Sequence, residues 1–438
     1  MDIDALRVRL AESAALRATG TVRSVTGLAV RVALPGARVG DVIQLVRRGD
    51  PLLAEIVGFD QGEAVAVPLG DMAGLGPDDP VVATGGPLEV QGGPSLLGRV
   101  LDGLGRPLDG TPLPAGLRSV PVDRAPPPAL ARQPVTRPLA TGVRAIDAFT
   151  TLGIGQRMGL FAGSGVGKSS LLGAIARGTG ADAVVVALVG ERGREVGDFL
   201  EHALGERGRR RSIVVVATSD APALERLRAV QVATAQAECL RDEGASVMLL
   251  VDSITRVARA QREVGLAAGE PPARRGYPPS VFALLPRLLE RSGQADRGSI
   301  TALYTVLVEG GDMDEPIADE VRGILDGHIV LERAIAARGH YPAIDITASL
   351  SRVMGNVVDE RHARAARRVR ALLAAYEEKR DLIALGAYVR GSVQLVDQAI
   401  EALPEIDELL CQSPNDLEPF ERTLQQLVRL ADRYCPET

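Results

Sequence analysis

Residues 161–170, FAGSGVGKSS, decide the fold class of this chain. They follow a short apolar run and precede LLGAIAR, a stretch with the composition of a helix. Glycines allow successive backbone N–H groups to converge on a phosphate without obstruction from Cβ atoms, and the helix N-terminus adds a favourable dipole. The order of strand, glycine-rich loop, Lys-Ser and helix therefore predicts a phosphate-binding loop rather than a turn that only caps a buried helix.

The loop predicts ATP and Mg²⁺ as the bound groups. Lys168 is expected to reach the β- and γ-phosphates, and Ser169 to ligate Mg²⁺. Ala162 stands where the common pattern has its first glycine, and we expect this small residue to be tolerated. The predicted nucleotide-binding residues of the loop are Gly163, Ser164, Gly165, Val166, Gly167, Lys168, Ser169 and Ser170.

The residues around this loop predict an α/β core. Strand-length apolar runs alternate with helical stretches, which favours a parallel sheet with crossover helices. The runs are continuously apolar, as expected when both faces of a sheet are covered. They occupy residues 158–162, 183–189, 213–218, 247–251 and 300–307.

The spacing of apolar residues at the two ends of the chain differs from that in the core. Closely spaced alternating runs such as TVRSVTGLAVRVAL and LLAEIVGF predict a small all-β barrel or sandwich, which the sequence does not distinguish. Beyond about residue 355, apolar residues recur at three- and four-residue spacing, which predicts a helical domain. The predicted domains are residues 1–92 (β-barrel with a short N-terminal segment), 93–365 (P-loop domain, with a Gly/Pro-rich surface connector at 93–138) and 366–438 (helices).

Two carboxylates are candidates for the chemistry. Asp252 ends an apolar run, and in P-loop proteins such an acid holds Mg²⁺ through water. Glu191 follows the next strand after the phosphate loop, so its carboxylate is expected near the phosphates, where it can polarise a water for attack on the γ-phosphorus. Glu195 is a weaker candidate for this role, since GERGREVGD holds several charged residues.

Composition excludes several other classes of protein. The 438 residues carry a net charge of −6, whereas a domain that binds nucleic acid usually has a positive net charge. The three cysteines show no CxxC pairing and no nearby histidine cluster, which argues against a disulfide framework or a zinc site. The first twenty residues lack the apolar region of a secretory signal, and no apolar run is long enough to span a bilayer. We therefore expect a soluble, cytoplasmic protein.

Several longer motifs resemble one family. GERGREV, TALYTVLVEGGDMDEPIADEVRGILDGHIVL and GHYPAIDITASLSRVM resemble the catalytic subunits of rotary-ATPase-like hexamers. Within that superfamily they are most similar to the type III secretion ATPases of flagella and injectisomes. LLGRVLDGLGRPLDG and LIALGAYVRGS extend the similarity over nearly the whole chain. The resemblance implies an N-terminal β-barrel, a RecA-like P-loop domain and a C-terminal helical domain, with six identical subunits in a ring.

The resemblance also implies roles for single residues. Glu191 would be the catalytic glutamate, and Arg192 a structural partner near the phosphates. Arg352 would be an arginine finger donated across a subunit boundary, although an exposed arginine or ion-pair partner is the simpler interpretation. Tyr341 would form one side of the adenine pocket, although aromatic residues more often serve core packing.

The function that the resemblance implies is ATP hydrolysis coupled to chaperone release, unfolding and export of proteins. GSGVGKS and GYPPSVFALLPRLLERSG favour the flagellar system over the injectisome. The implied partners are a stator protein at the N-terminal region, where the first twenty residues could form an amphipathic helix, a central stalk protein, export-gate proteins and chaperone–cargo complexes. The implied location is peripheral, at an inner-membrane export apparatus.

Other functions stay open at this point. A non-catalytic subunit of a rotary synthase would not need Glu191, and a catalytic subunit of a rotary ATPase would be a close relative. An RNA-translocating hexamer is disfavoured by the acidic balance. Gly311 stands where an acid is expected in relatives, and we make no prediction about its effect.

Overall fold

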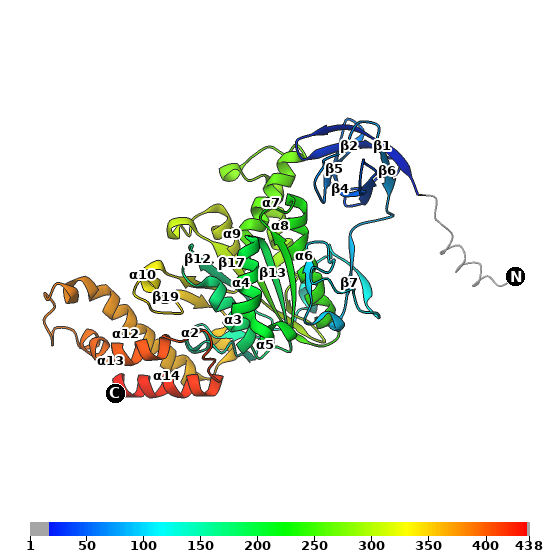
Figure 1. Cartoon of the computed structure of the whole chain (residues 1–438). Coiled ribbons are helices and arrows are strands. Elements are labelled where there is room, and N and C mark those ends of the chain that lie inside the picture. Colours follow the sequence, from blue (N-terminus) through cyan, green and yellow to red (C-terminus); the bar gives the residue numbers. More distant parts are fainter. Residues whose placement is uncertain (1–16, 436–438) are drawn as a thin grey trace.

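The computed structural model describes residues 17–435 in three parts that follow the chain. Figure 1 shows a β-barrel in blue, then a sheet covered by helices, and a group of helices in orange and red at the C-terminal end. The predicted barrel, α/β core and helical domain are therefore confirmed. The segment for which we considered an amphipathic helix lies, up to residue 16, outside the described residues.

The N-terminal part is a closed barrel of antiparallel strands, not a sandwich. The strands follow the order β1-β2-β5-β4-β3-β6, and β6 pairs back with β1. Alternate side chains, such as Val30 and Val32, are buried inside, as the two-residue period of a strand requires. The bounds are β1 Thr19–Thr26, β2 Ala29–Ala33, β3 Val42–Leu45, β4 Leu52–Asp60, β5 Glu63–Pro68 and β6 Pro80–Ala83.

The connector that we expected on the surface is partly built into the core, so that expectation was wrong. β8 (Val100–Asp102) joins the edge of the central sheet parallel to β14, and β7 (Glu89–Gly92) pairs with β9 (Arg118–Pro121). Leu96, Leu101 and Val122 are buried. Gly and Pro mark where the backbone turns, but the apolar residues between them supply strand and core. Two 3₁₀ turns, η1 (Pro94–Leu96) and η2 (Ala129–Ala131), complete this stretch.

The central sheet has the strand order β19-β18-β12-β17-β15-β13-β14-β8. It is parallel except for β19, which is antiparallel to β18, and a short β16 (Gly293–Gln294) beside β17. All five strands predicted for this core are present. The bounds are β12 Arg157–Ala162, β13 Ala183–Glu191, β14 Ser212–Thr218, β15 Ser246–Asp252, β17 Ser299–Leu307, β18 Gly327–Leu331 and β19 Ile344–Ser351.

Helices cover both faces of the sheet, which explains the continuously apolar strands. Val185 and Ala187 of β13 belong to one core, and Val184 and Val186 to the core on the opposite face. The first core is closed by α6 (Ala223–Asp242), α7 (Ile254–Ala267), α8 (Pro279–Leu289) and α9 (Pro316–Ile324). The second is closed by α2 (Arg144–Phe149), α3 (Lys168–Gly178), the π-helix η3 (Phe199–Leu204) and the C-terminal helices α12 (Glu360–Ala384), α13 (Gln394–Leu410) and α14 (Phe420–Tyr434).

Short elements complete the described chain. They are β10 Pro138–Leu139, β11 Leu152–Gly153, α4 Gly193–Asp198, α5 Gly205–Arg210, η4 Arg274–Gly276, η5 Glu309–Gly311, α10 Arg333–Ala337 and α11 Met354–Val357.

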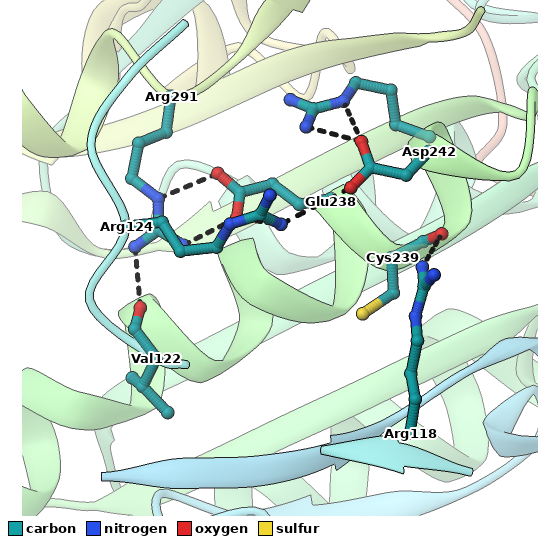
Figure 2. A network of polar contacts seen from close by, with 8 residues as sticks. Arg118, Val122, Arg124, Glu238, Cys239, Asp242 and Arg291 are labelled. Atoms are coloured by element: carbon teal, nitrogen blue, oxygen red, sulfur yellow. Dashed lines mark hydrogen bonds and ion pairs between the residues drawn. The ribbon is translucent and has the colours of Figure 1, made fainter. Parts of the chain in front are cut away.

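A buried polar network fixes the connector to α6, as Figure 2 shows. The Arg291 guanidinium donates to both carboxylate oxygens of Glu238, at 2.9 and 2.8 Å, and to the carbonyl of Val122 at 2.9 Å. Arg291 and Glu238 are each only 2% exposed. Arg124 approaches the same carboxylate at 3.5 Å, and Arg118 donates to the Cys239 carbonyl at 3.0 Å. The connector is thereby held on the helix that covers the sheet.

Candidate active site

The carboxyl ends of four adjacent central strands lie side by side and carry the predicted site. β12 leads into the phosphate loop, β15 ends at Asp252 and β13 ends at Glu191, with β17 between β12 and β15. Ligands of open parallel sheets bind at the carboxyl ends of the strands. A cavity of about 580 Å³ lies here, lined among others by Gly163, Ser164, Gly165, Gly167, Lys168, Ser169, Ser170, Glu191, Arg192, Glu195, Arg256, Arg259 and Arg333.

The phosphate loop has the geometry that the sequence predicted. Gly165 and Gly167 adopt positive φ angles of 79° and 86°, and α3 begins at the next residue, Lys168. Val166 does not line the cavity and is buried in the core below the loop, which anchors the loop to the domain. The N-terminus of an eleven-residue helix thus faces the cavity, which favours an anion.

Lys168 joins the two predicted carboxylates. Its Nζ forms an ion pair with Asp252 and lies 3.4 Å from Oε1 of Glu191. Asp252 also accepts a hydrogen bond of 2.8 Å from the Thr305 hydroxyl on β17. All three charged side chains are largely buried. The sequence placed these residues 23 and 84 positions apart from Lys168 in the chain, and the fold brings them together.

Arg256, on α7, is a site residue that our sequence analysis missed. Its guanidinium lies 3.1 Å from Oε2 of Glu191. Gly190 permits this contact, because its φ is 69° and a Cβ there would lie 2.9 Å from Cδ of Arg256. The spacing of Arg256 four residues after Asp252, in the first turn of the following helix, is the signal that could have identified it. Thr305 gave no signal, because threonine is common in strands.

Burial sets the protonation of Glu191. Desolvation of the carboxylate raises its pKa to about 7, although the positive charges of Lys168 and Arg256 act in the opposite direction. A hydrogen bond with Glu191 is the main cause that lowers the pKa of Glu195. A carboxylate with a pKa near neutrality is suited to accept a proton from water at physiological pH.

The cavity suits a polyanion with a divalent cation. Lys168, Arg192, Arg256, Arg259 and Arg333 line it, against the acids Glu191 and Glu195. Ser169 offers a hydroxyl at the cavity, and Asp252, the ion-pair partner of Lys168, offers a carboxylate. Both are hard oxygen donors of the kind that Mg²⁺ prefers. Among residues 17–435 no group of three or more His, Cys, Asp or Glu side chains forms a metal cage.

Tyr341 lines a second cavity, of about 370 Å³, which shares Gly165, Gly167 and Ser170 with the first. Gly167 lies against its ring, where a Cβ would be 3.3 Å from two ring carbons. The wall opposite the loop comes from the chain between α13 and α14, including Gln412, Pro414 and Leu417. The Gln412 N–H donates to the Tyr341 carbonyl at 2.7 Å. Our sequence analysis did not predict that the helical domain forms one wall of this cavity.

The two remaining predicted residues are exposed. Arg192 lines the phosphate cavity, its side chain 78% exposed, and it lies 3.7 Å from Glu195. Arg352 follows the end of β19 and does not line the cavity of its own chain. The P-loop residues, Glu191, Asp252 and Tyr341 are therefore gathered at the phosphate loop, and Arg352 is not. Fold and site together define a P-loop nucleotide hydrolase.

Three family models match the chain in the order of its parts. The ATP synthase alpha/beta family matches with its beta-barrel domain at residues 19–85 and its nucleotide-binding domain at residues 142–351. The T3SS EscN ATPase C-terminal domain matches residues 358–429.

Similar proteins give the same result over almost the full length. The flagellum-specific ATP synthase of Bacillus subtilis is 50% identical over 94% of each chain. The type 3 secretion system ATPase of Xanthomonas euvesicatoria is 51% identical over 98% of this chain and 97% of the relative. The solved structure of the assembled ATPase EscN from enteropathogenic E. coli superposes with a TM-score of 0.89 at 45% identity, covering 94% of this chain and 99% of that one. The chain belongs to the family of type III secretion and flagellum-specific ATPases, and it is an ATPase.

No helix in the described part of the chain is both long and apolar enough to cross a membrane.

Proposed function

We propose that this chain hydrolyses ATP in a ring of six identical subunits and so drives protein export through a type III apparatus. Glu191 orients and activates the attacking water, and Lys168 and Arg256 neutralise phosphate charge. Ser169 and Asp252 would hold Mg²⁺, the latter through water. Bound there, the ion would supply positive charge that offsets the negative charge developing on the transferring phosphoryl group. The adenine would lie against Tyr341 and the wall formed by residues 412–417.

The position of Arg352 carries the proposal of a ring. Lys168, Glu191 and Asp252 already converge in one chain, whereas Arg352 is exposed and lies apart from their cavity. An arginine supplied by a neighbouring subunit stabilises the charge of the transferring phosphoryl group and is worth roughly 10³–10⁵ in rate. Because one chain carries both Glu191 and Arg352, identical subunits complete every site. Arg192 would remain a structural partner near the phosphates.

The export partners are proposed from the relatives. One solved structure is of EscN with its central stalk EscO, and it superposes on this chain with a TM-score of 0.87. We propose an equivalent stalk here, together with a stator protein at the N-terminal region, export-gate proteins, chaperone–cargo complexes and a peripheral location at the inner membrane.

Relatives named for flagella and for secretion systems are equally similar, so our preference for the flagellar system stays a prediction. The net charge of −6 supports no nucleic-acid substrate. The domain limits 1–92, 93–365 and 366–438 also stay a prediction.

Mixing two inactive variants tests the shared active site. Arg352→Ala subunits keep Glu191 but lack the finger, and Glu191→Gln subunits keep the finger but lack the base. We expect each alone to keep only residual turnover, and their mixture to recover turnover, because some sites combine an intact Glu191 with an intact Arg352. A mixture that stays inactive while rings form would overturn the assignment of Arg352.

A further inference from the structure

Strand β12 connects the phosphate loop with the segment that carries Arg352. At its carboxyl end, Ala162 leads into the loop. Just before its amino end, Gln156 donates from Nε2 to the Asp326 carbonyl at 3.2 Å and to the Ser351 hydroxyl at 3.1 Å. The Arg352 N–H donates to the same Asp326 carbonyl at 2.9 Å. The backbone that presents Arg352 is therefore attached to the strand that presents the phosphate loop.

Asp326 is itself fixed to β12 from both backbone and side chain. Its N–H donates to the Arg157 carbonyl at 2.9 Å, and its Oδ2 accepts from the Arg157 N–H at 3.0 Å. The Arg157 guanidinium completes a two-pronged ion pair with the Asp326 carboxylate, with distances of 3.1 Å to each oxygen. Such forked pairs add geometric specificity as well as energy. The pair and the backbone bonds together hold Asp326, whose carbonyl accepts from the Arg352 N–H.

The surroundings of the pair make it stiff. Gln156 and Ser351 are buried, and the Ser351 hydroxyl donates to the Thr151 carbonyl at 3.1 Å. Arg157 also forms an ion pair with Glu290, whose carbonyl accepts from Arg132 of the connector at 2.9 Å. Arg352 itself is exposed. An exposed side chain thus projects from a segment whose backbone is held by buried groups.

We propose that Gln156, Arg157 and Asp326 are positioning residues that aim Arg352 at the active site of the neighbouring subunit. This rests on the proposed function, in which Arg352 acts across a subunit boundary. The phosphate loop of a subunit then follows the carboxyl end of β12, and the segment that presents its donated arginine is hydrogen-bonded at the amino end of the same strand. Because a misplacement of about 1 Å can lower a rate roughly 10²-fold, loosening this attachment should slow turnover without changing any residue that touches ATP.

The test uses the full-length chain with Asp326→Asn, which removes the charge of the pair but keeps the carbonyl that holds Arg352. Ser351→Ala, which deletes one hydroxyl, is a second variant in case the first fails to fold. Asp109→Asn is the matched control, because Asp109 forms a forked pair with Arg99, at 2.6 and 2.7 Å, beside β8. We expect Asp326→Asn to lower kcat about 10- to 100-fold with KM for ATP nearly unchanged. The control should keep its turnover.

Subunit mixing separates a donor defect from a general one. If the inference is correct, Glu191→Gln subunits, which donate an intact finger, will restore turnover to Asp326→Asn subunits, and Arg352→Ala subunits will not. Rescue by Arg352→Ala subunits alone, or a raised KM with unchanged kcat, would overturn it, because the defect would then lie in the nucleotide site of the same chain. Rescue by both would also overturn it, because the Asp326→Asn subunits would then donate a working finger. The mixture of Glu191→Gln with Arg352→Ala is run in parallel. If that mixture does not recover turnover, the proposed shared active site is wrong. That result is distinct from a failure of the positioning role of Asp326.

Discussion

At the scale of single residues, Glu191 is the side chain to which we assign the activation of the attacking water. We expect Glu191→Gln to lower kcat by about 10²–10⁴-fold, because an amide cannot accept the proton of the attacking water. Nucleotide binding should be retained, since Lys168 and the loop are untouched. Steady-state turnover with a fluorescent nucleotide titration checks both. Glu206→Gln, at an exposed acid of α5, is the control. Loss of binding together with turnover would contradict the role of base.

The acidity of Glu191 predicts a pH dependence. Burial raises the pKa of Glu191 to about 7, so the ionised form that accepts a proton exists above this pH and is lost as the pH falls below it. We expect kcat/KM to fall about tenfold per pH unit below about pH 7. The residual activity of Glu191→Gln should lack this dependence. If it keeps the same dependence, another group, such as the nucleotide, is titrating.

Tyr341 predicts a binding defect of a different kind. Stacking of a base on an aromatic ring is worth roughly 1–3 kcal/mol, so Tyr341→Ala should raise KM for ATP about 5- to 150-fold. Tyr341→Phe keeps the ring and should change KM little. Because Tyr341 is 40% exposed, the Tyr341→Ala variant is expected to fold. Equal effects of the two substitutions in a KM measurement would argue for the hydroxyl and against stacking.

At the scale of elements, most of the central sheet could be predicted. Its five core strands are continuously apolar in sequence, and the phosphate loop identifies the end of the strands at which the site lies. β8 could not be predicted, because only three residues within a Gly/Pro-rich stretch pair with the sheet edge. The same limit applies to the site. Lys168, Glu191 and Asp252 lie in recognisable local patterns, whereas Arg256, Thr305 and the wall at Gln412 acquire their positions only through tertiary packing.

The buried pair between α6 and the end of α8 predicts a large effect on stability. Arg291→Ala leaves the buried Glu238 without its closest partner and should lower the free energy of unfolding by about 3–5 kcal/mol. Arg124→Ala removes a partly exposed arginine from the same carboxylate, and about 0–1 kcal/mol is expected. Urea denaturation followed by circular dichroism compares the two. Similar losses would show that Glu238 does not depend on Arg291 in particular.

At the scale of the whole molecule, the proposed ring predicts that activity depends on concentration. Turnover per subunit should rise as the concentration of the protein rises, because dilution separates Arg352 from the neighbouring Glu191. Arg352→Ala should stay low at every concentration, even where mass photometry shows rings. Turnover that is high and constant while the protein is monomeric would mean that each chain completes its own site.

The cavity beside Tyr341 has a consequence for the synthesis of the chain. Its near wall belongs to the phosphate loop, at residues 165–170, whereas its far wall, at residues 412–417, is translated much later. A nascent chain can therefore have its phosphate loop outside the ribosome long before the base has a surface to rest on. Tight binding of ATP in the proposed site then requires translation through residue 417, and shortened translation products that end before residue 412 would be poor competitors for the nucleotide.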